Sequence, residues 1–182
     1  MSYTLQDFCA DMHDILTKEN NPAGRDKVRQ KMAELLKNEE FIRQFCGPDK
    51  KDGVYTLNED PETGAVVLSH CMDKAHVSPP HDHGTSWAIY GQAAEHTVMR
   101  EYERVDDGSD PDKAELTLTK EYTLNRGDVG VFNPGQIHSI DYPDHARFVR
   151  VTGVDLNRID RTAFNTERGV AQTIRSQGVA VD

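Results

Sequence analysis

The chain has 182 residues, which is enough for one domain with a substantial hydrophobic core and too few for two complete domains. Its formal net charge of -10 argues against a nucleic-acid partner, because phosphate binding requires clustered lysine and arginine. No apolar run approaches the about 20 residues of a membrane span, and the start lacks a signal-peptide pattern. We therefore expect no membrane association and a cytoplasmic location.

The first fifty residues are predicted to be helical. Apolar side chains recur at the three-four spacing of one helical face over residues 5–18. Residues 20–24 break this pattern, and a second periodic run follows over residues 28–36. A short third helix is expected around residues 40–45. We expect residues 1–50 to pack as a helical segment against the structure that follows.

From residue 54 onward, short runs rich in β-branched and aromatic residues alternate with turn sequences and predict strands. The predicted strands are residues 54–57, 65–72, 85–90, 97–105, 114–123, 130–132, 137–141 and 146–154. Their number and spacing are typical of a β-sandwich or barrel and not of alternating βαβ units. We assign residues 51–165 to one barrel within a single domain. Residues 166–182 are expected to form a tail on the surface or against the neighbouring subunit of a homodimer.

Three histidines stand out within the predicted strands. His81 and His83 follow Pro79 and Pro80, and on an extended strand they would point to the same face. His138 comes much later, just after a Pro-Gly turn. Three neutral imidazoles that meet inside a barrel would hold a metal and leave coordination positions free for a substrate. The sequence therefore predicts a metal site formed by His81, His83 and His138.

The two histidine segments resemble the first and second motifs of the cupin superfamily. In that superfamily a double-stranded β-helix holds a metal through HxH on one strand and a lone histidine on a later strand. The resemblance implies a mainly β fold, the cupin jelly roll, with helices added at the N-terminus. Ordinary cupins have a glutamate four or five residues after the second histidine, where this chain has Trp87 and Ala88. Glu95 and His96 come later, and a role for either as an extra ligand stays open.

Further segments are similar to the cysteine dioxygenase type branch of the thiol dioxygenases. They are residues 55–58, the run from Pro79 to Trp87, and residues 147–153. Members of this branch use Fe(II) on three histidines to add both atoms of O2 to a thiol sulfur. The resemblance implies Fe(II) as the metal, and O2 and a small molecule as the partners. Trp87 is expected to shape the pocket of such a site.

The chain departs from this branch at positions that bind the substrate. Leu57 stands where cysteine-specific members have an arginine that holds the substrate carboxylate. Phe148, Arg150 and Thr152 replace an alternating Ser, His and Tyr on a late strand. The resemblance therefore does not imply cysteine as the substrate. On this inward face, Arg150 is expected to orient an anionic group of the substrate.

A structural role for Arg150 is the alternative, in which its guanidinium pairs with an acid such as Asp128 or Asp141. Three functions also stay open. The favoured one is a non-heme Fe(II) dioxygenase acting on a small anionic molecule, with thiols among the candidates. The second uses a redox-silent metal such as Zn, Ni or Mn as a Lewis acid for isomerisation, elimination or hydrolysis. The third is a cupin that binds a small molecule without turnover.

Overall fold

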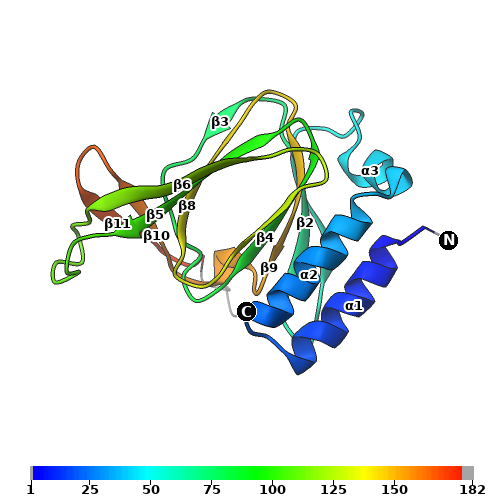
Figure 1. Cartoon of the computed structure of the whole chain (residues 1–182), viewed down its shortest axis with the longest axis horizontal. Helices are drawn as coiled ribbons and strands as arrows, with labels where there is room; N and C mark the ends of the chain where they lie inside the picture. The colour runs from blue at the N-terminus through cyan, green and yellow to red at the C-terminus, as the bar shows by residue number, and fades with distance from the viewer. Residues whose placement is uncertain (1, 178–182) are drawn as a thin grey trace.

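The computed structural model describes residues 2–177 (Figure 1). The helices are α1 (Leu5–Lys18), α2 (Pro22–Leu35) and α3 (Glu39–Cys46). The strands are β1 (Gly53–Glu59), β2 (Val66–Cys71), β3 (His76–Val77), β4 (Ala88–Ala94), β5 (Thr97–Arg104), β6 (Leu116–Leu124), β7 (Val129–Phe132), β8 (Ile137–Tyr142), β9 (Arg147–Thr152), β10 (Arg161–Asn165) and β11 (Val170–Ile174). A short 3-10 helix, η1 (Leu156–Arg158), lies between β9 and β10.

Each α-helix begins at a polar capping residue. Thr4 caps α1, where the Asp7 backbone N–H donates to the threonine hydroxyl at 3.2 Å and the Asp7 carboxylate accepts from the Thr4 N–H at 2.9 Å. Asn21 and Asn38 cap α2 and α3 through their side-chain oxygens. These caps satisfy backbone N–H groups that the first helical turn leaves free. The sequence prediction of three N-terminal helices is confirmed.

Two antiparallel sheets face each other and form the β domain (Figure 1). One has five strands in the order β1-β2-β9-β4-β7, and the other has four in the order β3-β8-β5-β6. Strands distant in the sequence are neighbours in both sheets, as they are in a jelly roll. The predicted mainly β, double-stranded β-helix with N-terminal helices is confirmed by this arrangement.

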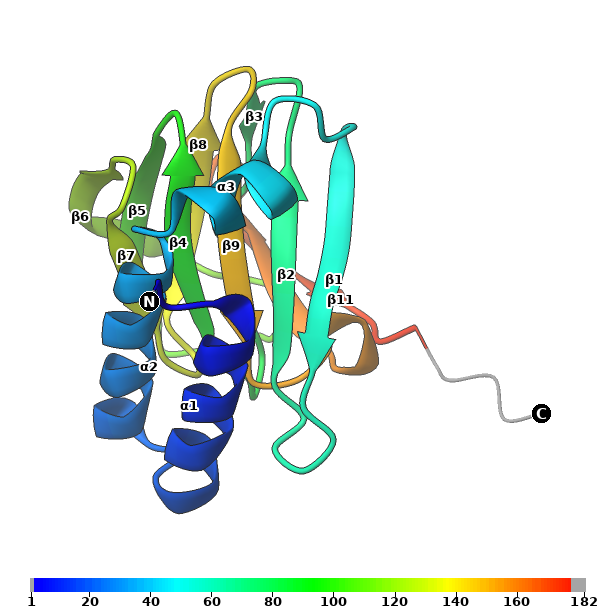
Figure 2. The ribbon, with the colours of Figure 1, turned by 90° about the vertical axis from the view of Figure 1, so that its right-hand side faces the viewer.

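The five-stranded sheet has the helices on its outer face, as Figure 2 shows. Ile89, Val149 and Val151 point toward the helices and join one buried cluster with them. Tyr90 and Phe148, which alternate with those residues along the strands, join a second cluster between the two sheets. Side chains of opposite parity on β4 and β9 therefore have different surroundings, and Arg150 shares the inward parity of Phe148.

The chain after β9 returns to the barrel and pairs with the histidine segment. The Phe164 N–H donates to the Pro80 carbonyl at 2.8 Å, and β10 pairs with β11. The weak periodicity of the predicted tail did not indicate β11, and the rest of that prediction, residues 178–182, lies outside the described residues. No helix within residues 2–177 is long and apolar enough to span a membrane.

Candidate metal centre

The backbone joins the two histidine segments directly. The His81 N–H donates to the His138 carbonyl at 2.8 Å, and the His138 N–H donates to the His81 carbonyl at 2.9 Å. This reciprocal pair is an isolated antiparallel bridge, and His83 lies in the loop that follows it. The prediction of one strand through both histidines is therefore wrong. Consecutive prolines at 79 and 80 cannot donate to a ladder, and Gly84, at a φ of 58°, turns the chain after His83.

The three rings nevertheless converge. One ligand atom each from His81, His83 and His138 lies within 4.8 Å of the other two. The Nε2 atoms of His83 and His138 are 3.3 Å apart, and these two side chains are 1% and 0% exposed. The structure thus brings together all three predicted ligands in the barrel interior, with His81 the most accessible of them.

A hydrogen bond to the Pro79 carbonyl sets the tautomer of the His81 ring. Its Nδ1 lies 3.0 Å from the Pro79 carbonyl oxygen, which can only accept, so Nδ1 carries the hydrogen and Nε2 keeps a lone pair. Nδ1 of His83 and Nδ1 of His138 are buried without a hydrogen-bond partner among residues 2–177. Stacking helps to hold the His138 ring, because the Phe132 ring centroid lies 3.9 Å from its own.

All three imidazoles are neutral at neutral pH. Burial lowers the pKa of His83 and of His138 well below the usual value for histidine, and repulsion from His81 and Arg150 lowers both further. Burial also lowers the pKa of His81, although its bond to the Pro79 carbonyl opposes the shift. Each ring therefore offers a lone pair and not a second N–H.

This donor set fits a first-row divalent metal. Metal–nitrogen bonds of about 2.1 Å at tetrahedral to octahedral angles place imidazole nitrogens about 3.0 to 3.4 Å apart. The 3.3 Å between Nε2 of His83 and Nε2 of His138 falls in this range. Three neutral nitrogens suit Fe, Zn, Ni or Mn without selecting among them.

Tyr90 is a polar neighbour of the centre, and the sequence alone did not show which way its side chain points. Its hydroxyl lies 3.3 Å from Nε2 of His83, and the side chain is 2% exposed. Tyr90 also pairs across the sheet with Arg150 of β9. Only the alternation along β4, which points Tyr90 inward together with Ala88, could have indicated this position.

Arg150 lines a cavity of about 420 Å³ together with Leu68, Thr152 and Arg161, and none of the three histidines lines it. The Arg150 guanidinium is nevertheless close enough to the imidazoles to lower the pKa of all three. The alternative pairing with Asp128 or Asp141 is not observed. Asp141 pairs with Arg100 at 3.4 Å. The Asp128 carboxylate accepts from the Asn125 backbone N–H.

Trp87 does not reach the site. Its side chain is 3% exposed and belongs to the cluster between the sheet and the helices. The Arg25 guanidinium lies 5.9 Å from the tryptophan ring, and a Cβ on Gly153 would be 2.5 Å from Trp87 Nε1. The expectation that Trp87 shapes the pocket is corrected by this placement, because Trp87 has the outward parity of Ile89.

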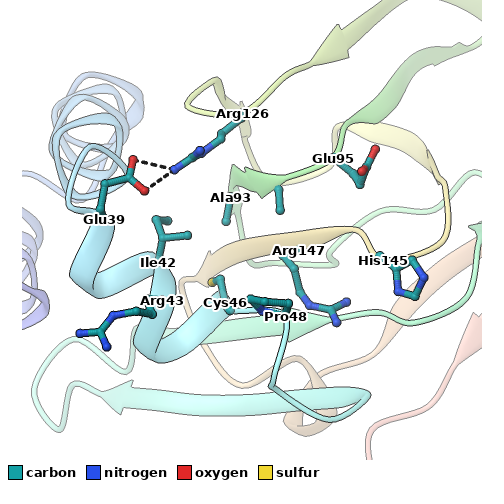
Figure 3. A pocket seen from close by; sticks show the side chains of 12 residues that line it. Glu39, Ile42, Arg43, Cys46, Pro48, Ala93, Glu95, Arg126, His145 and Arg147 are labelled. Atoms are coloured by element: carbon teal, nitrogen blue, oxygen red, sulfur yellow. Dashed lines mark hydrogen bonds and ion pairs between the residues drawn. The ribbon is translucent and has the colours of Figure 1, made fainter.

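A larger cavity, of about 580 Å³, lies between α3 and the ends of β4 and β9, as Figure 3 shows. Glu39 and Arg126 form an ion pair at 2.6 Å at its edge. None of the three histidines lines it. Glu95 lines it from the turn after β4, where Glu95 and His96 are both exposed and outside the three-histidine group. The structure therefore does not place either at the centre as an extra ligand.

No protein-family model matches the sequence, and no curated protein sequence is significantly similar to it. Similar solved structures include the Cnp3 cupin domain of Schizosaccharomyces pombe, with 9% identity and a TM-score of 0.44, covering 59% of this chain and 66% of that chain. An oxalate oxidase in complex with the substrate analogue glycolate has 16% identity and a TM-score of 0.39, covering 57% and 52%. KdgF from Halomonas sp. has 17% identity and a TM-score of 0.39, covering 54% and 74%. The match spans less than two thirds of each of the first two chains.

Proposed function

We propose that this chain is a metal-dependent enzyme of the cupin type, and that it acts as a non-heme Fe(II) dioxygenase on a small anionic molecule. The observation that carries the proposal is the cluster of three neutral imidazoles, with the Arg150 guanidinium close enough to lower the pKa of all three. The sequence resemblance to the cysteine dioxygenase type branch supports iron and O2. A bound Fe(II) would supply the redox chemistry.

The residues of the chain supply position and surroundings. His81, His83 and His138 would hold the metal. Arg150 would bind a carboxylate of the substrate through two parallel N–H donors, which fixes its orientation as well as its position. Phe148 is 3% exposed in the cluster between the sheets, where its ring centroid lies 6.0 Å from that of Tyr90.

The chain differs from the cysteine-specific thiol dioxygenases at the position that binds the substrate carboxylate. Leu57 lies on β1 in place of the carboxylate-binding arginine of cysteine-specific members, so a carboxylate would have to bind at Arg150 on β9 instead. Small carboxylates with and without a thiol group are thus the substrates to test first.

Oxygen consumption tests the proposal. Protein stripped of metal and reloaded with Fe(II) should consume O2 with at least one small carboxylate or thiol carboxylate. The His138→Gln variant should not, whereas His76→Gln, at an exposed position outside the three-histidine group, should behave as wild type. If the wild-type protein binds iron and consumes no O2 with any member of the panel, the dioxygenase proposal fails.

A redox-silent metal enzyme is the second candidate, and the Tyr90 hydroxyl favours it. Isomerases, lyases and hydrolases need a group that moves a proton beside the metal, and this hydroxyl lies 3.3 Å from His83 Nε2. Product formation without O2 in protein loaded with Zn(II), Ni(II) or Mn(II) would support this function. Thermal stabilisation by a ligand that is never converted would instead support a binding protein.

A further inference from the structure

Arg161 lies at the start of β10, beside the histidine segment. The Thr162 N–H donates to the Asp82 carboxylate at 2.9 Å, and the Asp82 N–H donates to the Thr162 carbonyl at 3.0 Å. The backbone next to Arg161 is thus tied to the residue between His81 and His83. Arg161 and Arg150 line the same cavity, of about 420 Å³. Guanidinium groups from two separate strands therefore line one cavity, and both are close enough to His81 and His83 to lower the pKa of these imidazoles.

Neither guanidinium forms a hydrogen bond or an ion pair with another residue of the part of the chain that the structure describes. The Nε atoms of Arg150 and Arg161 are buried without a hydrogen-bond partner among the described residues. Other arginines of the chain form ion pairs, such as Arg147 with Asp73 at 2.9 Å. Arg25 and Arg147 also have a buried Nε without a partner, but their other guanidinium nitrogens bond to Asn133 and Asp73. No such bond is found for Arg150 or Arg161 within residues 2–177.

The acidic groups nearest the cavity are already engaged. Asp155 and Glu59 line it, and both pair with Arg158 at 3.4 Å. The Asp155 carboxylate also accepts from the Asn157 N–H at 3.0 Å. The Asp82 carboxylate accepts from the backbone N–H groups of Gly84 and Thr162, each at 2.9 Å. Asp82 and Asp155 attract Arg161 over a longer distance but do not form a direct pair with it.

Two unpaired cations at one cavity destabilise the fold, because each loses hydration and repels the other. Burial, followed by repulsion from Arg150, lowers the pKa of Arg161. A protein keeps such an arrangement more readily when a ligand supplies the missing negative charge. Two guanidinium groups on different strands match a ligand with two separate anionic groups better than a single carboxylate.

We propose that Arg150 and Arg161 form a two-guanidinium site that binds small dicarboxylates, and that the substrate of the proposed reaction is such a dianion. The identification of the dianion as substrate rests on the proposed function, whereas the binding itself needs no metal. Val66, Leu68 and Leu156 line the cavity between the polar groups and would contact a short carbon chain. The volume of about 420 Å³ lies within the usual range for small-molecule sites.

Calorimetric titration of the full chain tests the site with matched probes. Malonate is compared with propionate, and succinate with butyrate, first on protein freed of metal and of chelator and then on the metal-loaded protein. At least one dicarboxylate should bind with a Kd at least about tenfold below that of its matched monocarboxylate. Equal affinities for both members of each pair, or no measurable binding of either dicarboxylate, would overturn the proposal. So would tighter binding of inorganic phosphate than of both dicarboxylates.

Variants assign the preference to the two arginines. Arg161→Gln and Arg150→Gln should each reduce the preference for the dianion to less than about threefold, and Arg161→Lys should keep part of it. Arg168→Gln, at an exposed position after β10, should leave it unchanged. A full preference in folded Arg161→Gln would overturn the role of Arg161. Because a half-buried charge without a direct partner is removed, metal-free Arg161→Gln should also melt at a higher temperature than wild type, and a lower melting temperature would count against the unpaired state.

The outcomes separate this proposal from the proposed function. Selective binding of a dicarboxylate without any metal-dependent turnover would leave the two-guanidinium site standing and refute the enzyme. Metal-dependent turnover of monocarboxylates without a preference for dianions would support the enzyme and refute the two-guanidinium site.

Discussion

Nε2 of His83 lies 3.3 Å from Nε2 of His138, although the two residues are 55 positions apart in the chain. Burial keeps both rings neutral, and at this separation their nitrogens can either share one proton or bind one metal. The Tyr90 hydroxyl, 3.3 Å from the same His83 nitrogen, is the protein group that competes for this position. A metal at this position therefore requires the lone pair of Nε2 from both His83 and His138.

Loss of His138 should remove the metal. In His138→Gln the amide cannot replace a neutral imidazole at this position, so metal content should fall from about one equivalent to less than about 0.1, a loss of affinity of at least about hundredfold. Elemental analysis of protein reloaded with Fe(II) measures this. The exposed His76→Gln variant serves as the control. If His138→Gln and His76→Gln both keep a full equivalent of metal, the three-histidine centre is not where the metal binds.

Arg150 should affect the substrate more than the metal. Arg150→Ala removes charged hydrogen bonds of about 1.5 to 3 kcal/mol, so KM for an anionic substrate should rise about 10- to 100-fold at an unchanged metal content. Steady-state kinetics and metal analysis on the same preparation give both quantities. Arg168→Ala is the control, because Arg168 is exposed and does not line the cavity. An unchanged KM in Arg150→Ala would exclude the proposed orienting role.

The sequence predicted the parts of this molecule that depend on local pattern. Helical periodicity located the helices, and the strand runs indicated a β domain, because both patterns reflect neighbours within the same segment. His81, His83 and His138 were found because a motif keeps them at fixed positions relative to turns. The spacing alone did not show that His81 lies on an isolated bridge and His83 in a loop.

The positions missed by the sequence depend on long-range pairing. Trp87 directly precedes β4. Successive side chains of a strand point to opposite faces, so an error of one position moves Trp87 from the face covered by helices to the barrel interior. Arg161 reaches the cavity only because Thr162 and Asp82 bond to each other 80 positions apart. No periodic pattern in residues 161–165 records that pairing.

Trp87 should contribute to the stability of the fold and not to metal binding. Trp87→Ala should leave a large cavity between the sheet and the helices and reduce the free energy of unfolding by about 3 to 5 kcal/mol. Trp87→Phe fills more of the space and should cost less. Urea denaturation measures both losses, and metal per folded molecule should not change. A Trp87→Phe protein of wild-type stability with a reduced metal content would instead place Trp87 at the site.

The stability of the helical layer should depend on pH through His13. Its Nδ1–H donates to the Asp60 carboxylate at 2.7 Å and joins α1 to the turn between β1 and β2. The hydrogen bond to Asp60, and attraction to Asp60 and Glu62 against some desolvation, raise the pKa of His13 in the folded chain. A raised folded-state pKa stabilises the protein fully below the unfolded-state pKa, and the contribution is lost as the pH rises through the folded-state pKa.

Wild type should therefore exceed His13→Gln in melting temperature by more at about pH 5.5 than at about pH 8.5. Because His13 is 38% exposed, added salt should reduce the difference at the lower pH. His76→Gln is the matched control, since His76 is exposed and has no carboxylate partner among residues 2–177. A difference that is equal at both pH values would mean that His13 contributes only a neutral hydrogen bond, and one that grows with pH would contradict the direction of the pKa shift.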